Sequence, residues 1–175
     1  MKLQTTFIFL SSLVAATLAS TVTTDFATIN TRTTALDNSI KAFSITAGTL
    51  AQALAIHNDA VAVNSAVTKT TSDLQVALKP IADSDTDTIL EDLAILDPIV
   101  QSALTGIVAK KPAFDALPIG NGSGTAKQDL KDLSNSATTL LTTLAGAVST
   151  GKVAQVNAYK TKFQTGLQVA TNAYN

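Results

Sequence analysis

The helical repeat of apolar residues through residues 84–117 constrains the fold more than any other feature of the sequence. The apolar positions are three or four residues apart, which places them on one face of an α-helix. They are Ile89, Leu93, Leu96, Val100, Ala103 and Ile107. Ser84 and Thr88 are each followed three residues later by a carboxylate, so either could cap the first turn. We therefore expect a central helix with one buried apolar face.

Two prolines disturb this central segment. Pro98 lacks a backbone N–H, and its ring clashes with the preceding turn, so it predicts either a kink or a break into two helices. Pro112 follows Lys110 and Lys111 and weakens the far end of the helix.

The same three-and-four repeat recurs in four more segments, which begin near Val22, Leu50, Leu130 and Val153. Threonine is abundant and prefers strands, but no segment shows sustained alternation of apolar and polar residues. We expect separations at residues 44–49, Pro80, the glycine loop 118–124 and Gly151, with Thr125 and Gln128 as a capping box after the loop. The sequence thus predicts an all-α bundle of about five amphipathic helices, the central one containing a proline kink.

The N-terminus has the pattern of a secretory signal peptide. Lys2 precedes an apolar run from Phe7 to Leu18, and Thr17 and Ala19 are small residues at signal-peptidase spacing. We expect cleavage after Ala19, which leaves residues 20–175 as a single helical domain in a secreted, extracellular protein. No later stretch has the length and composition expected of a membrane span, and the end of the chain lacks a hydrophobic tail, so no transmembrane anchor is predicted.

Composition excludes some function classes. Removing Lys2 from the 12 basic residues leaves 11 against 13 acidic residues, a formal charge of −2, which offers no electrostatic footprint for nucleic acid. The chain has no cysteine, so packing of its 46% hydrophobic residues must hold it together.

The sequon at Asn121 lies among three glycines and predicts an exposed glycosylation site.

No catalytic group is recognisable. His57 is the single histidine, with no cysteine nucleophile and no serine in a nucleophile-elbow pattern, so we interpret it as structural or partly exposed. Glu91 is the single glutamate, and the aspartates are scattered over predicted helix starts and polar faces, which does not suit paired carboxylate chemistry. We expect neither an enzyme nor a cofactor.

A metal site is also not expected. Asp83, Asp85 and Asp87 resemble the opening of a calcium loop, but the sixth position is Thr88 instead of glycine and the twelfth is Ala94 instead of glutamate. These carboxylates instead suit the positive end of a helix dipole.

Wide aliphatic faces with interleaved small residues and few aromatics would allow a cavity between the helices. The alternative is a plain packed core, because apolar stripes at helical spacing usually pack together.

The sequence resembles the fungal hydrophobic surface-binding protein A family, which includes the antigenic cell wall galactomannoproteins. The resemblance rests on LAQALAIHNDAVAVNSAVTKTTSDL at 50–74 and SDTDTILEDLAILDPIVQSALTGIVAKKPAFDAL at 84–117, and it extends over roughly residues 22–174. It implies a secreted or wall-associated helical domain that adsorbs to hydrophobic surfaces, recruits polymer-degrading esterases in some members and binds fatty acid in a central tunnel in others. The chain lacks the Ser/Thr/Pro-rich stalk of the longer wall mannoproteins, which argues against stable wall attachment.

Our first hypothesis is a non-enzymatic protein that holds a fatty acid or other amphipathic lipid between its helices. The candidate lining is Phe43, Leu50, Leu54, Val67, Leu74, Leu93, Leu96, Val100, Ile107, Leu140, Leu144, Phe163 and Leu167. Ser72, Ser102 and Thr143 are alternative hydroxyls for the carboxylate. The rival hypotheses are a surface-active adhesion protein that adsorbs to hydrophobic surfaces and recruits hydrolases, and a structural cell-wall mannoprotein without a ligand.

Overall fold

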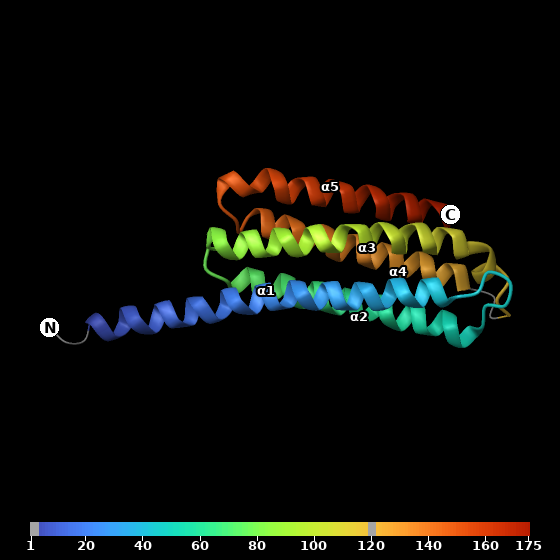
Figure 1. Ribbon diagram of the computed structural model, residues 1–175, viewed down its shortest axis with the longest axis horizontal. Coiled ribbons are helices and arrows are strands. Elements are labelled where there is room, and N and C mark those ends of the chain that lie inside the picture. The colour runs from blue at the N-terminus through green and yellow to red at the C-terminus, as the bar shows by residue number, and fades with distance from the viewer. Residues whose placement is uncertain (1–3, 119–121) are drawn as a thin grey trace.

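The computed structural model describes the backbone of residues 4–118 and 122–175, and the side chains of residues 21–118 and 122–175. It contains the helices α1 (Gln4–Ala42), α2 (Leu50–Val76), α3 (Asp83–Asp115), α4 (Gly122–Ala145) and α5 (Thr150–Ala173). The helices run up and down in turn along one long axis (Figure 1), and the described residues form no strand. The expected all-α bundle of about five helices is confirmed.

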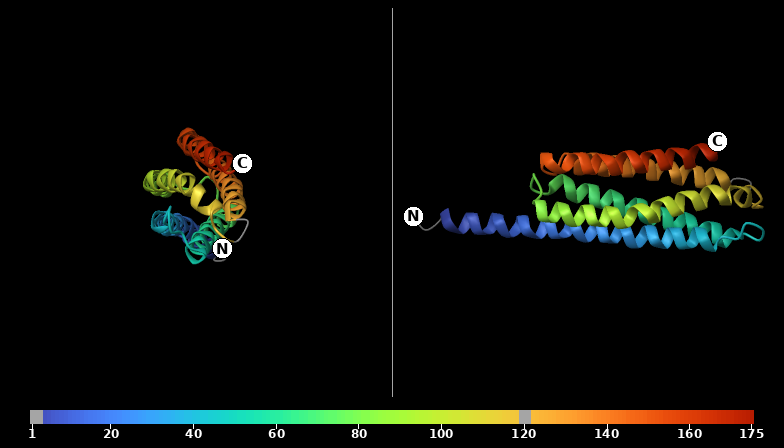
Figure 2. Two further views of the ribbon diagram at one scale, coloured as in Figure 1. Left: turned by 90° about the vertical axis from the view of Figure 1, so that its right-hand side faces the viewer. Right: turned by 45° about the horizontal axis from the view of Figure 1, so that its top comes forward.

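The helices form a closed ring. Each packs mainly against two others, in the order α1, α2, α4, α5, α3 and back to α1, and a view close to the bundle axis shows the same order (Figure 2). Because each helix turns one face toward the middle of the ring, the apolar stripes of all five meet there. Ile89 and Leu93 of α3 and Phe26 of α1, for example, are almost completely buried in one apolar core.

α3 is one uninterrupted helix with Pro98 and Pro112 inside it, so the alternative of a break into two helices is wrong. The kink itself stays a prediction. The expected caps are also wrong, because the residue preceding the helix is Ala82 and no side chain caps the first turn. Ser84 and Thr88 lie inside the helix, where the Thr88 hydroxyl donates to the Ser84 carbonyl at 3.2 Å.

α4 begins at Gly122, three residues before the expected capping box, so Thr125 and Gln128 already lie within the helix. A Cβ atom at Gly122 would lie 2.7 Å from the Phe114 carbonyl oxygen. Glycine therefore allows the first turn of α4 to approach the end of α3 closely. The sequon residue Asn121 lies outside the described residues.

The turn before α5 also differs from the expectation. Gly151 lies in the first turn of the helix, and the chain reverses at residues 146–149 instead. A Cβ atom at Gly151 would meet nothing within 4 Å, so no close contact requires glycine there. Residues 4–19 of the predicted leader form the start of α1 and lie before the first described side chain, and cleavage after Ala19 stays a prediction.

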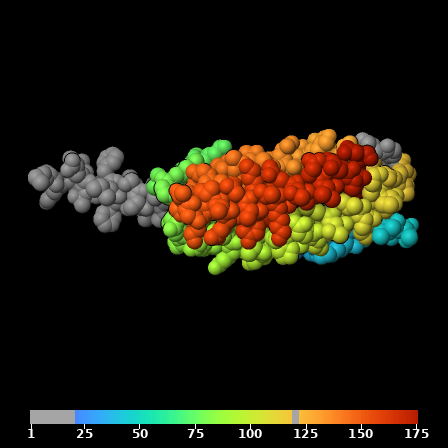
Figure 3. Space-filling model, turned by 90° about the horizontal axis from the view of Figure 1, so that it is seen from above, coloured from blue at the N-terminus to red at the C-terminus, as the bar shows by residue number. Residues whose placement is uncertain are grey.

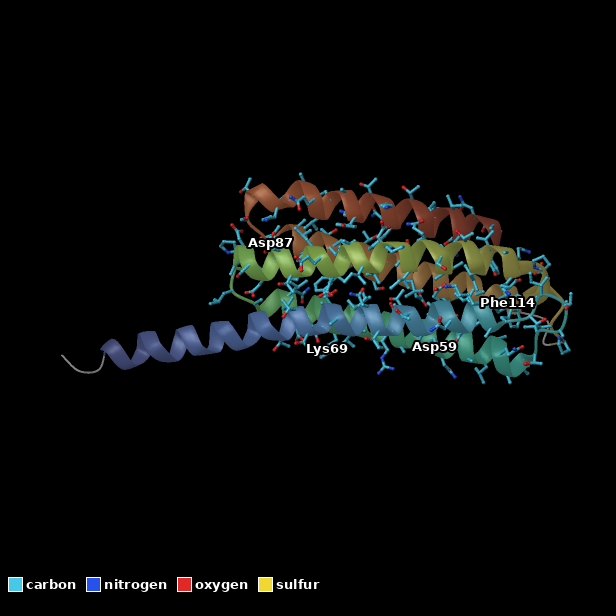
Figure 4. The ribbon with its side chains drawn as sticks, viewed as in Figure 1. Asp59, Lys69, Asp87 and Phe114 are labelled. Carbon is cyan, nitrogen blue, oxygen red and sulfur yellow. The ribbon has the colours of Figure 1, made fainter. Side chains whose placement is uncertain are left out.

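Aspartates join the helices to one another. Asn30 of α1 donates to the Asp92 carboxylate of α3 at 3.0 Å. Lys69 of α2 contacts Asp25 of α1 and Asp73 of its own helix, both at 2.7 Å. Figure 4 places Lys69 beside the joint between α1 and α2. The scattered acidic residues of the sequence thus serve largely as contacts between and within helices.

Aromatic rings close one end of the bundle. Phe43, after α1, lies 4.7 Å from Phe114 of α3 between ring centroids, and Tyr174 meets the edge of Phe114 at 6.3 Å. The Tyr174 hydroxyl donates to the Ile107 carbonyl at 2.7 Å. In Figure 4, Phe114 lies at this end and Asp87 at the opposite one.

Among the described helices, α3 is long and apolar enough to cross a membrane by length and composition, with a mean hydropathy of 1.4 over its best window. This corrects the expectation that no later segment has such a composition. In the structure α3 contacts α1, α4 and α5, and 22% of this window is buried inside the protein.

Candidate functional site

A cavity of about 300 Å³, partly open to solvent, lies between α1, α2, α3 and α4. Its walls include the small residues Ala53, Ala60, Ala103 and Ala126, one or more from each of α2, α3 and α4. The larger side chains around it come from Leu36, Ile40, Leu50, Leu54, Ile56, Leu104, Ile107, Phe114, Leu130 and Leu133. We call this space the proximal cavity, because it lies toward the end of the bundle closed by Phe114.

A second cavity of about 90 Å³, the distal cavity, has walls from all five helices. Its lining is entirely apolar apart from Thr33, whose hydroxyl donates to the Ile29 carbonyl at 2.8 Å within α1. The remaining walls are Phe26, Ile29, Leu36, Val63, Val67, Leu93, Leu96, Val100, Ala103, Leu104, Leu133, Ala137, Leu140, Leu141, Phe163 and Leu167.

The two cavities adjoin. Leu36, Ala103, Leu104 and Leu133 line both of them, so one layer of side chains from α1, α3 and α4 is common to the two spaces. The pair forms an elongated apolar interior with a shape suited to a long, narrow ligand.

One pair of ionisable side chains lies in the wall of the proximal cavity. His57 of α2 contacts Asp129 of α4, with His57 Nδ1 3.0 Å from both carboxylate oxygens. The side chain of His57 is 37% exposed and that of Asp129 is 14% exposed. Burial raises the pKa of Asp129, and the hydrogen bond from His57 acts in the opposite direction. The proximal cavity therefore has a polar side, whereas the distal cavity does not.

The structure brings most of the predicted lining residues to one cavity or the other. Leu50, Leu54 and Ile107 line the proximal cavity. The distal cavity is lined by Val67, Leu93, Leu96, Val100, Leu140, Phe163 and Leu167. Phe43, Leu74 and Leu144 line neither, because they are completely enclosed by other side chains of the core.

The three candidate hydroxyls line neither cavity. The hydroxyls of Ser72 and Thr143 donate to carbonyls one turn earlier in their own helices, and Ser102 donates to Asp37 of α1 at 2.9 Å. The sequence analysis did not identify the His57–Asp129 pair as the polar part of the cavity. The signal in the sequence was the position of His57 between Leu54 and Val61, in a series that is otherwise apolar from Leu50.

Two of the aspartates that resemble the opening of a calcium loop form contacts between helices. Asp83 accepts a hydrogen bond from Ser149 at 2.8 Å, and Asp87 pairs with Lys152, so both connect the start of α3 to the start of α5. The described part of the chain has no group of three or more side chains that could hold a metal ion.

A groove of about 590 Å³ runs along the outside of the bundle between α3 and α5. Figure 3 shows the face on which α5 lies between α3 and α4. Leu104 lines this groove as well as both cavities, so its side chain separates the outer surface from the interior. A Cβ atom at Gly166 would lie 2.8 Å from Leu104 Cδ1, so glycine gives that side chain its room.

The structure is similar to solved proteins of the same fold. Ligand-binding domain 1 of the Penicillium marneffei MP1 protein, solved with arachidonic acids, has a TM-score of 0.77 and 16% identity, over 87% of this chain and 95% of that one. AFMP4P, solved with palmitic acid, has a TM-score of 0.81 and 22% identity, over 90% and 99% of the two chains. Domain 2 of the MP1 protein, also solved with arachidonic acids, gives a TM-score of 0.73 at 12% identity, over 90% and 92%.

A comparison with curated protein sequences found no match. The family model described as hydrophobic surface binding protein A matches residues 19–146, well over half of the chain. The helical ring agrees with that match, and the chain belongs to the hydrophobic surface binding protein A family.

Proposed function

We propose that this protein is a non-enzymatic lipid-binding protein that holds a fatty acid in the proximal and distal cavities. The observation that carries the proposal is the pair of adjoining apolar cavities inside the ring. Similar structures with arachidonic and palmitic acids support it, because those ligands are long apolar chains that end in a carboxylate.

The apolar interior provides enough driving force for such a ligand. Burial of an acyl chain contributes about 0.8 kcal/mol per methylene, so ten methylenes give about 8 kcal/mol. Association and ordering cost several kcal/mol of this, on the order of 4 or more. The remaining 4 kcal/mol or so corresponds to a dissociation constant of about 1 mM, and each further buried methylene strengthens binding.

Native mass spectrometry of the secreted protein, followed by denaturing extraction, tests this proposal. The expected result is one fatty acid per chain, or uptake of added palmitic acid by the delipidated protein. A protein that carries no lipid and takes up none would contradict the proposal and favour a structural wall mannoprotein without a ligand.

The non-enzymatic part of the proposal rests on the family and its lipid-binding neighbours, which point to a binding protein. His57 is the single residue of its kind in the chain. Ester and glycoside substrates should therefore give the same background turnover with the wild type and His57→Ala. Turnover that His57→Ala abolishes would show that the protein is an enzyme.

Adsorption to hydrophobic surfaces is the second candidate function, and a stripe on α2 favours it. Leu50, Leu54 and Val61 share one face of the helix and are 45%, 53% and 47% exposed. Leu50 and Leu54 also line the proximal cavity, so this stripe lies at the cavity wall that meets solvent. Exposed apolar patches of this kind often mark binding surfaces.

Binding to polystyrene beads tests the second function. The double variant Leu54→Lys with Val61→Lys should adsorb less than the wild type, while the control Thr161→Lys, on the exposed face of α5, should adsorb normally. Hydrogen exchange on the bead distinguishes adsorption of the intact ring from opening of the helices. Equal adsorption of all three proteins would show that the α2 stripe is not the adsorbing surface.

Recruitment of a secreted esterase is tested by adding the enzyme to protein-coated beads.

We also propose that the protein is secreted and extracellular, with an association with the cell wall. The sequence pattern of residues 1–19 and the family support this location. The secreted protein should begin at Ser20, and removal of N-linked glycan should lower its mass unless Asn121 is replaced by Gln. Retention of residues 1–19 in a membrane fraction would contradict the proposal.

A further inference from the structure

The polar residues of the proximal cavity are concentrated on one side. Of the eighteen described residues that line it, three are polar: His57 of α2, and Thr125 and Asp129 of α4. The contributions of α1 and α3 are entirely apolar. An amphipathic ligand in this cavity would therefore find polar partners only along the joint between α2 and α4.

The geometry of the pair orients the histidine ring. An ionised carboxylate only accepts hydrogen bonds, so when Asp129 is ionised the contact at 3.0 Å from both of its oxygens places a proton on His57 Nδ1. Nε2, on the other side of the ring, contacts no hydrogen-bonding partner among the described residues and is not among the enclosed unpaired atoms. The ring thus presents an accessible nitrogen whose orientation Asp129 fixes.

We propose that His57, oriented by Asp129, binds the carboxylate headgroup of the fatty acid in the proximal cavity. This inference rests on the proposed lipid-binding function and identifies the polar contact of the same site. Asp129 is a positioning residue, since it acts through the histidine and does not itself touch the ligand.

The charge arrangement favours an anionic headgroup over a neutral one. Protonated imidazole donates from both nitrogens, so Nε2–H can donate to a ligand carboxylate while Nδ1–H donates to Asp129. The cation then lies between the two carboxylates and is nearer to each than they are to one another, so attraction exceeds repulsion. Two further carboxylates lie near the pair. Asp132, one turn along α4, adds a negative charge near Asp129. Asp59 of α2 accepts a hydrogen bond from Ser39 of α1.

The same arrangement makes binding depend on pH. With a proton on Nδ1 alone, neutral His57 presents the lone pair of Nε2, which repels a carboxylate. An anionic ligand therefore favours the protonated ring, so the affinity for an anion should be higher at pH 5.5 than at pH 8.0.

Calorimetric titration with two twelve-carbon probes tests the inference. Dodecanesulfonate stays anionic between pH 5.5 and 8.0, so any pH dependence of its affinity comes from the protein, and dodecanol is its neutral counterpart. The sulfonate should bind roughly tenfold tighter at pH 5.5 than at pH 8.0, the scale of one charge-assisted hydrogen bond. Dodecanol should bind equally at both values.

Three variants isolate the headgroup contact. In His57→Gln the amide can still donate to Asp129 but carries no charge, so sulfonate affinity at pH 5.5 should fall roughly tenfold and its pH dependence should disappear. Dodecanol affinity should not change. Asp129→Asn should weaken sulfonate binding at pH 5.5, because the protonated ring loses its carboxylate partner. The control Asn58→Gln, at an exposed neighbour, should behave like the wild type, and circular dichroism checks that all three fold.

The outcomes separate this inference from the function it rests on. If dodecanol binds, but sulfonate affinity is the same at both pH values and in His57→Gln, the headgroup assignment is wrong and the lipid cavity remains. If the wild type binds neither probe, the proposed function fails, and the headgroup site fails with it.

Discussion

Replacing Ala103 by leucine should make the protein without lipid more stable and its lipid complex weaker. Ala103 is buried in α3 and lines both cavities, so an enlarged side chain can extend into space that no other side chain fills. Most enlargements of a packed core have the opposite effect, because they force neighbours apart. The sign of the change in stability therefore tests whether the cavity exists.

The magnitude follows from the added atoms. Leucine adds three carbons, and each buried methylene contributes about 0.8 kcal/mol, or about 2.4 kcal/mol in total. Ordering the leucine side chain costs about 0.5–1 kcal/mol, which leaves a gain in unfolding free energy of about 1.5 kcal/mol. For a domain of this size the melting temperature should rise by about 3–6 °C. Displacing a similar length of acyl chain should weaken palmitic acid binding by about 2 kcal/mol, roughly thirtyfold.

Thermal and urea unfolding of the delipidated protein, together with fatty-acid titration, measure the two effects. The matched control is Ala113→Leu, since Ala113 is equally buried in α3 but lines neither cavity. The control should lose about 1–3 kcal/mol of stability through overpacking.

A result in which Ala103→Leu is destabilised as much as Ala113→Leu would refute the reasoning. It would mean that side chains close the space around Ala103 in solution, and the ring would then have a plain packed core. Gain of stability without loss of lipid affinity would place the ligand elsewhere, and the outer groove between α3 and α5 would be the first alternative.

Three further predictions test the core and the contacts between helices. Leu144→Ala, at a fully enclosed position outside both cavities, should cost about 2–5 kcal/mol in urea unfolding and leave the intrinsic fatty-acid affinity of the folded protein unchanged. Burial raises the pKa of Asp92, so its contribution to stability is complete below the ordinary value near 3.8 and is lost as the pH rises through the folded-state pKa. Asp92→Asn should therefore gain stability relative to the wild type between pH 3 and pH 7, and an unchanged difference would contradict this. Tyr174→Phe removes the 2.7 Å hydrogen bond to the Ile107 carbonyl and should cost about 1 kcal/mol in thermal unfolding, with no effect at pH 7 from ionisation because burial raises the pKa of the hydroxyl.

The helical repeat predicted the fold because each segment has its own apolar face. Ile56, Ala60 and Val63 of α2 recur at helical spacing, and all three are buried. Leu54 and Val61 recur on another face of the same helix but are half exposed, because α2 packs mainly against α1 and α4 in the ring. Periodicity identifies the apolar faces, but the order of helices around the ring decides which of them is covered.

The helix ends were less predictable, because close contacts between distant segments fix them. At Gly122, where α4 begins, a Cβ atom would lie 2.7 Å from the Phe114 carbonyl oxygen, and such a contact leaves no mark in the local sequence. The polar side of the proximal cavity was hidden for the same reason. His57 and Asp129 are 72 residues apart, and nothing in either segment indicates that the two would meet.

The cavity itself depends on side-chain size and not on apolar pattern. Phe43 and Leu93 have equally clear positions on inner faces, yet Phe43 packs on Phe114 at the end of the ring while Leu93 borders the distal cavity. The lining of the proximal cavity includes four alanines among larger apolar side chains, and the short alanine side chains leave space beside them. Five helices around a common axis leave more central space than four, so the same apolar repeat gives a closed core or a cavity according to the size of the side chains in each layer. A sequence-based search for lipid-binding members of this fold should therefore compare the side-chain volumes at the inward-facing positions of each layer of the bundle. Hydrophobicity alone does not distinguish a packed core from a cavity.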